Sequence, residues 1–263
     1  MAAFMDLLHN KPRALWLDDH AYCARLLAAG HAPWLDTGAF VAWQRKAQGL
    51  LKADVVSLPI TAVIEAWLAA HPALRAQMAA KSRSTYALRT LLADEPQRAH
   101  LVELVQGLRA GLAGLPLALV LPAPRAWVLI AYTQAHGQST EVGEDEADGA
   151  SVYIADFLRA FGEAGVDALL LQQFEDGAGC QSLLNVAAHY RWDVGVQGAA
   201  TAVPAGVAFA IAEAARAAVP TGIALPEAFW EGETKVANGA FSYAHIPVTA
   251  QPEAVLERLA TLR

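Results

Sequence analysis

The stretch Ala14-Leu15-Trp16-Leu17-Asp18-Asp19-His20 decides the fold class that this sequence predicts. Four apolar residues are followed at once by two carboxylates and an imidazole. A buried strand that ends in ionisable groups is typical of a parallel barrel, in which each strand opens onto the active-site face at its carboxyl end. The alternative is structural, because an acidic pair after a strand can also cap the next helix by accepting its free N–H groups. Taken alone, the stretch leaves both interpretations open.

The rest of the chain repeats this pattern of short apolar segments, separated mostly by amphipathic helical ones. Together with the first stretch, residues 54–58, 117–121, 168–173, 183–187, 207–211, 222–225 and 241–246 are predicted as strands. Eight such strands predict a single (β/α)8 TIM-type barrel spanning residues 1–263. The connections before and after the sixth strand are short, so we expect the second half of the barrel to be trimmed or irregular. The acidic segment 136–149 has no apolar period and is predicted as a flexible, solvated loop.

Composition narrows the class of protein further. A chain of 263 residues that is 55% hydrophobic can bury a large core. The net charge of -7, without a cluster of Lys or Arg, argues against nucleic-acid binding. Cys23 and Cys180 have no metal-binding or redox spacing, and no signal peptide or membrane-spanning stretch is recognisable. We therefore expect a cytoplasmic protein that acts on a small molecule, and the oligomeric state, a homodimer among the options, is left open.

Three regions carry a likeness to a known family: Leu117–Pro124 with Trp127 and Tyr132, Phe157–Ala168, and Phe241–Pro247 with Pro252–Val255. In this order they resemble the third strand and its Gly-x-Pro-like turn, the fourth helix and strand, and the eighth strand and following helix of the uroporphyrinogen decarboxylase superfamily. That superfamily also contains the cobalamin-independent methionine synthases and the corrinoid-protein methyltransferases. The likeness spans nearly the whole chain. It implies this type of barrel and a histidine that lines the site at His245.

The departures from the family pattern limit what the likeness implies about activity. Where the decarboxylase has arginines that hold substrate carboxylates, this chain has Asp18-Asp19-His20-Ala21-Tyr22. Its essential aspartate after the second strand is replaced by the run Leu58-Pro59-Ile60. A substrate rimmed with carboxylates needs a basic site, so decarboxylation of a porphyrinogen is not expected. The zinc-binding cysteine of the methyltransferases is absent from Asn185–Arg191, and Cys180 lies too early to replace it.

Ionisable and polar residues at the predicted strand ends are the candidates for the site. We predict Asp18, Asp19, His20, His189 and His245 as catalytic, and Tyr22, Arg125, Gln172, Gln173, Glu175, Asn185, Tyr190, Arg191 and Trp192 as substrate-binding, with Asp176 a further candidate. Read without the likeness, a lone histidine such as His245 in an apolar strand is more often a core residue.

The run His189-Tyr190-Arg191-Trp192-Asp193 combines a group that exchanges protons near neutral pH with a permanent cation that grips carboxylates. Its aromatic residues suit a flat ligand. In the structural alternative, Arg191 pairs with Asp193 and the aromatic rings are packing residues. No cofactor is predicted; if a metal such as zinc is bound, Asp18, His20, Glu175 and His189 have suitable ligand types.

The leading hypothesis is therefore a cofactor-independent lyase, most concretely a decarboxylase of a small, possibly aromatic, carboxylic acid. Arg191 or Arg125 would anchor the anionic group, and His20, His189 or His245 would protonate the carbon that is left behind. Two alternatives stay open: a methyltransferase, possibly metal-assisted, and a barrel that binds a ligand without catalysis.

Overall fold

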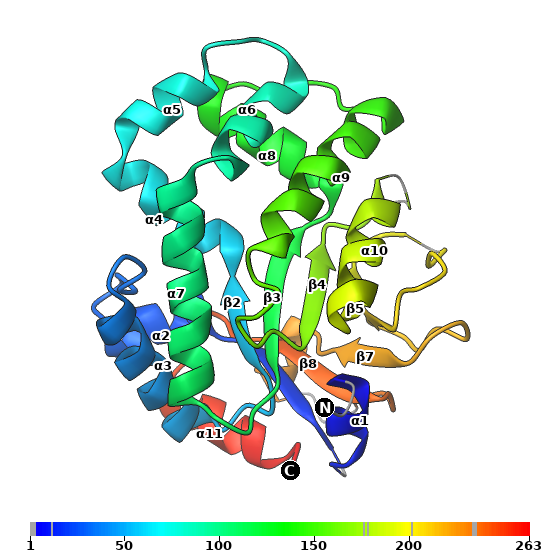
Figure 1. Cartoon of the computed structure of the whole chain (residues 1–263). Coiled ribbons are helices and arrows are strands. Elements are labelled where there is room, and N and C mark those ends of the chain that lie inside the picture. The colour runs from blue at the N-terminus through cyan, green and yellow to red at the C-terminus, as the bar shows by residue number, and fades with distance from the viewer. Residues whose placement is uncertain (1–3, 12, 176, 178, 201, 233–235) are drawn as a thin grey trace.

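The computed structural model describes all residues of the chain except 1–3, 12, 176, 178, 201 and 233–235. Eight parallel strands form one sheet that curves into a nearly closed barrel (Figure 1). They are β1 (Leu15–Asp18), β2 (Val56–Pro59), β3 (Leu117–Pro122), β4 (Ala168–Gln172), β5 (Asp193–Gln197), β6 (Phe209–Ala212), β7 (Thr221–Ala224) and β8 (Phe241–His245). Helices alternate with the strands, so the predicted (β/α)8 barrel is confirmed.

The helices are distributed unevenly around the barrel. The first half carries α1 (Phe4–His9), α2 (His20–Leu27), α3 (Thr37–Leu51), α4 (Ile60–Ala70), α5 (Pro72–Met78), α6 (Ser84–Leu92), α7 (Glu95–Gly111), α8 (Pro124–His136), α9 (Glu144–Arg159) and α10 (Cys180–Tyr190). After β5, the only helices that the described residues form are the short 3-10 helix η1 (Glu227–Phe229) and α11 (Pro252–Ala260). The expectation of a trimmed second half is therefore confirmed within the described part of the chain.

Alternation along the strands separates two cores. Residues that point outward from the strands pack against the helices, whereas every second residue points into the barrel. The interior is filled largely by the aromatic rings of Trp16, Phe209, Phe241 and Tyr243. Helix α1 closes the amino-terminal end of the barrel, because its Phe4 ring stacks on Phe209 at 5.4 Å between ring centroids.

Two strands make room for these rings by carrying glycine at an interior position. A Cβ atom at Gly195 of β5 would lie 2.0 Å from the Phe209 ring, and one at Gly222 of β7 would lie 2.2 Å from the Phe241 ring. Carbon atoms cannot approach so closely, so each glycine is required by the ring on the neighbouring strand.

The strand order β1-β8-β7-β6-β5-β4-β3-β2 places β1 and β2 at the two ends of the sheet. Side chains join these two ends across the β1–β2 gap. The indole Nε1 of Trp16 donates to Ser57 Oγ at 2.7 Å, and the backbone N–H of Leu15 donates to Asp54 Oδ2 at 2.8 Å. The backbone N–H of Asp54 also donates to the carbonyl oxygen of Leu15 at 2.8 Å, so backbone and side-chain hydrogen bonds together close the barrel at this point.

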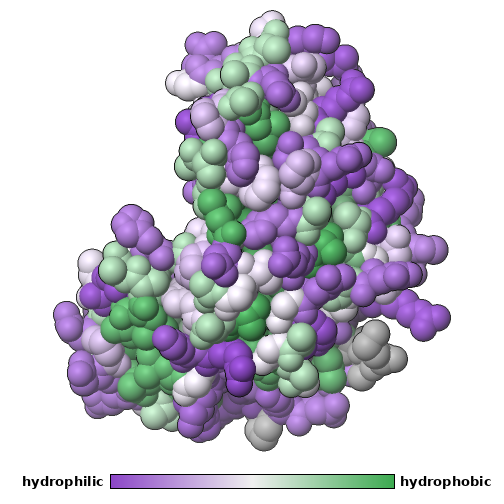
Figure 2. All heavy atoms as spheres, turned by 60° about the vertical axis from the view of Figure 1, so that its left-hand side comes forward, coloured by the Kyte–Doolittle hydropathy of each residue, from purple (hydrophilic) through white to green (hydrophobic). Residues whose placement is uncertain are grey.

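An upper lobe rises over the carboxyl ends of β2, β3 and β4. It consists of α5, α6 and the adjoining parts of α8 and α9, which lie beyond the arrowheads of these strands (Figure 1). Helix α6 packs against both α8 and α9. Figure 2 shows this lobe standing over a wider base, with a hollow at the step between them.

Two sequence predictions are wrong. Residues 183–187, predicted as the fifth strand, belong to α10, and the fifth strand is Asp193–Gln197. The acidic segment predicted as a loop at 136–149 begins with the last residue of α8 and runs into α9 from Glu144. Glu144, Asp145 and Glu146 form the first turn of that helix, where negative charge is favourable because the backbone N–H groups point toward it. Glu146 accepts a hydrogen bond from the N–H of Gly143 at 3.0 Å.

Candidate active site at the mouth of the barrel

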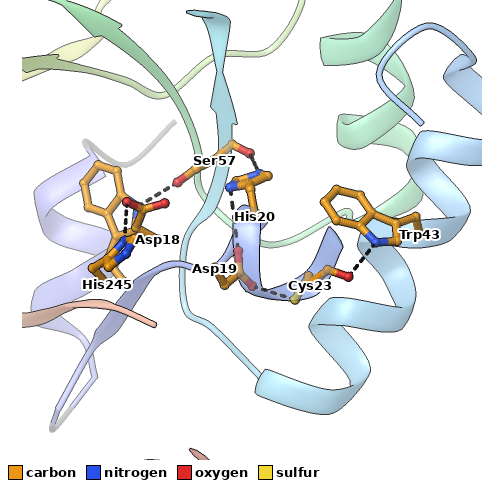
Figure 3. A network of polar contacts seen from close by, with 8 residues as sticks. Asp18, Asp19, His20, Cys23, Trp43, Ser57 and His245 are labelled. Atoms are coloured by element: carbon orange, nitrogen blue, oxygen red, sulfur yellow. Dashed lines mark hydrogen bonds and ion pairs between the residues drawn. The ribbon is translucent and has the colours of Figure 1, made fainter. Parts of the chain in front are cut away.

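A carboxylate–imidazole pair forms the rim of the barrel mouth. Asp18 and His245 are the last residues of β1 and β8, and the parallel register places them side by side. His245 Nδ1 lies 3.0 Å from Asp18 Oδ2, and the two side chains point toward one another in Figure 3. Their exposed fractions are 40% for Asp18 and 56% for His245, so solvent and a ligand can reach both.

The pKa values of the two groups are shifted in the directions that suit a proton donor. The hydrogen bond with Asp18 raises the pKa of His245 above its ordinary value, although partial burial opposes the change. Burial acts to raise the pKa of Asp18, but the hydrogen bond from His245 and the positive charges of His20 and His245 lower it below its ordinary value. Both changes favour the ionised form of the pair over the neutral form, compared with the two groups apart. Because Nδ1 faces the carboxylate, Nε2 is the nitrogen that can deliver a proton to a ligand.

A second set of polar contacts joins Ser57, His20 and Asp19. His20 is buried, and its Nε2 lies 3.0 Å from the carbonyl oxygen of Ser57. A carbonyl oxygen can only accept, so Nε2 carries the hydrogen. The other ring nitrogen, Nδ1, lies 3.7 Å from Asp19 Oδ1. The stack of His20 on Trp34, with 5.7 Å between ring centroids, fixes the plane of the imidazole.

The contacts of Asp19 show whether its carboxylate caps the helix that follows. It occupies the N-cap position of α2, but among the described residues no backbone N–H of that helix donates to its carboxylate. Instead, Cys23 Sγ donates to Oδ2 at 3.7 Å. Burial raises the pKa of Asp19, while the nearby charge of His20 opposes the change. Asp19 is therefore a buried carboxyl group coupled to His20.

A phenol–amide cluster reaches across the interior of the mouth from β8 to β4 and β5. Tyr243 points inward from β8, and its hydroxyl lies near the side-chain amides of Gln172 of β4 and Gln197 of β5. The two amides also contact one another, with Gln172 Nε2 donating to Gln197 Oε1 at 3.1 Å. Of these three residues, sequence reasoning identified only Gln172. Tyr243 could have been found from strand alternation, because it is two residues before His245, whereas Gln197 ends β5, which was not predicted as a strand.

A small cavity lies between the rim pair and this cluster. Its volume is about 40 Å3, and it is lined by Trp16, Leu17, Asp18, His20, Ser57, Pro59, Val120, Gln172 and Tyr243. A water molecule occupies a share of about 30 Å3 in the liquid, so the cavity can accept a few atoms at most. A larger ligand would place one group here and the remainder above the mouth.

Three further predicted residues lie around a second hollow on the mouth side. Arg125, Gln173 and Glu175 line a depression of about 340 Å3 between the ends of β3 and β4 and the segment that follows α8. Arg125 Nη1 donates to the carbonyl oxygen of Val142 at 2.8 Å. Gln173 has a φ of 55°, a left-handed conformation that is uncommon for residues other than glycine. Asp176 lies outside the described residues.

The remaining predicted residues do not reach the mouth. Tyr22 is buried in the core between the barrel and the helices, with Arg25 over its ring. Asn185, His189, Tyr190, Arg191 and Trp192 belong to α10 and the turn into β5, because the strand once assigned there is a helix. His189 and Tyr190 are the end of that helix, which leads to the amino-terminal end of β5. That end lies opposite the mouth.

These residues lie on the outside of the barrel instead, at the helices α9 and α10. Asn185, His189 and Tyr190 line a depression of about 480 Å3 between α9 and α10. The Tyr190 ring stacks on Trp192 at 5.0 Å between centroids, and it covers Gly162 so closely that a Cβ there would lie 2.3 Å from it. These aromatic residues are packing residues.

The predicted metal ligands are not gathered at one place. His189 lies at the end of α10, away from Asp18 and His20, so this set cannot surround one ion in the observed fold. Within the residues that the structure describes, no group of three or more His, Cys, Asp or Glu side chains has an arrangement that could hold a metal ion.

Comparison of the chain with known protein families, with curated proteins and with solved structures found no match. The likeness to the uroporphyrinogen decarboxylase superfamily therefore stays a prediction. In the described part of the chain, every helix is too short or too polar to cross a membrane.

Proposed function

We propose that the barrel mouth is the active site of a cofactor-independent lyase that decarboxylates a small carboxylic acid. The observation that carries this proposal is the Asp18–His245 pair, a positioned imidazole with a raised pKa whose Nε2 can reach a ligand. Decarboxylation leaves a carbon atom that must be protonated, and a charged imidazole held by a carboxylate is suited to this step.

Asp18, His245 and Arg125 each have a role in this proposal. Asp18 orients His245 and stabilises its charged form, and His245 protonates the carbon after carbon dioxide leaves. Of the two arginines predicted to anchor the substrate, Arg191 follows α10 at the far end, whereas Arg125 begins α8 on the mouth side. We assign Arg125 to the anionic group, since a guanidinium grips a carboxylate through two parallel hydrogen bonds.

The test is a panel of small carboxylic acids incubated with the protein in D2O, followed by measurement of released carbon dioxide and of deuterium in the product. Wild-type protein should convert at least one acid, and His245→Gln should lower its rate by about 10²- to 10⁴-fold, the usual contribution of a general acid. His71→Gln is the matched control, because His71 lies beyond α4 and stacks on Trp67. A His245→Gln variant with the wild-type rate would contradict the proposal.

No observation favours either alternative to the same extent. Methyl transfer to a thiol by the route of this superfamily needs a gathered set of thiolate or imidazole ligands, and Cys23 and Cys180 are both buried. A barrel that only binds its ligand would be supported if a carboxylic acid stabilised the protein but was not converted, with equal binding to wild type and His245→Gln.

A further inference from the structure

We infer that Tyr243, which lines the cavity at the barrel mouth, is a second catalytic residue that donates a hydrogen bond to a ketone oxygen of the substrate, and that the substrate is a β-keto acid. This inference rests on the proposed function, since it names the electron-accepting group that such a decarboxylation needs. It adds a residue and a substrate class that the Asp18–His245 pair does not supply.

The first support is the position of Tyr243. It precedes His245 by two residues on β8, so both side chains point into the barrel from the same strand, and Tyr243 lies one layer deeper. Its side chain lines the 40 Å3 cavity together with Asp18 and Gln172. A ligand that places an oxygen atom in this cavity therefore contacts the phenol while its other atoms lie at the level of His245.

The second support is the pair of amide side chains beside the phenol. Gln172 and Gln197 come from two neighbouring strands and are hydrogen-bonded to each other at 3.1 Å, and both amides lie near the Tyr243 hydroxyl. Burial and the negative charge of Asp18 raise the pKa of Tyr243. The hydroxyl thus keeps its proton and can donate a hydrogen bond to a bound oxygen on which negative charge develops.

The third support is the size of the cavity. About 40 Å3 admits a carbonyl oxygen and its carbon but no ring or branched group. The carboxylate that leaves must therefore lie above the cavity, toward the open mouth, where carbon dioxide can escape.

Chemistry then specifies the substrate class. When the bond between the carboxylate and its neighbouring carbon breaks, the electron pair must move into an acceptor, and without a cofactor that acceptor belongs to the substrate. A ketone β to the carboxylate takes the pair as an enolate, whose oxygen carries the charge and accepts the hydrogen bond of Tyr243. His245 then protonates the enolate carbon, and its lost proton is replaced from water. The balance is R–CO–CH2–COO⁻ + H⁺ → R–CO–CH3 + CO2.

The test compares acetoacetate with butyrate, which lacks the ketone, in wild type, Tyr243→Phe and the control Tyr86→Phe on α6. We expect acetoacetate to lose carbon dioxide with wild type and butyrate to be inert. Tyr243→Phe should lower kcat by about 10²- to 10³-fold, as for loss of one oxyanion donor, while KM changes less than about tenfold. Tyr86→Phe should retain wild-type kcat.

A measurement on the wild-type protein covers the case in which Tyr243→Phe does not fold. The ketone carbon of ¹³C-labelled acetoacetamide, which cannot decarboxylate, should shift downfield on binding because the hydrogen bond polarises the carbonyl group. An unshifted resonance for the bound amide overturns the inference. So does a Tyr243→Phe variant with wild-type kcat, or equal conversion of acids that lack a ketone; in these cases the proposed lyase survives. Failure of every acid in the panel overturns the lyase itself.

Discussion

Replacing Asp18 by Asn isolates the charge of the carboxylate at the barrel mouth. An Asn side chain has nearly the same shape, and its Oδ1 can still accept from His245 Nδ1, so the variant removes the charge and keeps the contact. Two unit charges 3.0 Å apart attract by about 1.4 kcal/mol at the dielectric constant of water, which corresponds to about one pKa unit. The side chains are 40% and 56% exposed, and such pairs contribute about 0.2–1 kcal/mol because solvent screens them. We therefore expect the pKa of His245 to fall in Asp18→Asn, because the charged imidazole loses about 0.2–1 kcal/mol of stabilisation.

The assay is a proton NMR titration of the imidazole resonances, with His245 identified by the signal that disappears in His245→Gln. No substrate is needed. Asp36→Asn serves as the control, since Asp36 caps α3 and should leave the titration of His245 unchanged. A pKa of His245 that stays constant or rises in Asp18→Asn would refute the reasoning, because the carboxylate would then not stabilise the charged imidazole.

The same pair makes folding stability depend on pH. The raised pKa of His245 contributes stability that is complete below its unfolded value of about 6.5 and is lost as pH rises through the folded value. The lowered pKa of Asp18 contributes stability above its unfolded value of about 3.9, which is lost as pH falls through the folded value. Asp18→Asn should therefore be most destabilising, relative to wild type, between about pH 4 and 6.5.

Three further predictions concern the scaffold and can be measured by urea unfolding. Asp36→Ala should cost about 1 kcal/mol, because Asp36 accepts from the N–H of Ala39 at 2.8 Å, whereas Asp36→Asn should stay near wild type; equal loss in both would contradict the cap. Phe4→Ala should cost about 3–5 kcal/mol, since this ring is fully buried at the closed end of the barrel, and a loss under about 1 kcal/mol would show that α1 does not close it. Gly162→Ala should destabilise through a clash with the Tyr190 ring, and the double variant with Tyr190→Ala should cost less than the sum of the single changes. Additive losses would contradict that contact.

The sequence predicts a barrel strand well where the strand itself carries large apolar side chains. β3 is buried at all of its positions, and its apolar run is bounded by prolines, so both its existence and its ends are readable. β5 is different, because its interior position is Gly195 and the volume is filled by a ring from β6. When a neighbouring strand supplies the apolar side chain that fills the interior, the sequence of the strand itself shows little hydrophobic pattern.

The same ambiguity explains the error at α10. Its buried residues include Leu183, Leu184, Val186 and Ala187, and so short an apolar run fits a buried strand or one face of a helix equally well. Since this segment was predicted as a strand, the residues after it were expected at the mouth. One shifted element thus moved five predicted site residues to the wrong end of the barrel.

The core of the candidate site could be reached from sequence for a different reason. Asp18 and His245 are 227 residues apart, but each ends a predicted strand, and the ends of parallel strands meet. Partners such as Gln197 and the backbone carbonyl of Ser57 could not be named in this way, because their roles depend on register and on the β1–β2 gap.

Helix α1 has a consequence for the order of events during synthesis. Phe4 packs on Phe209, and the N–H of Met5 donates to Asp193 Oδ2 across 188 positions of the chain. A ribosome that adds about 5–20 residues per second exposes α1 for roughly ten seconds or more before these partners emerge. During that time the apolar face of the helix has no native surface to bind. Helix α1 is therefore among the last elements of the barrel to dock, although it precedes every strand in the chain.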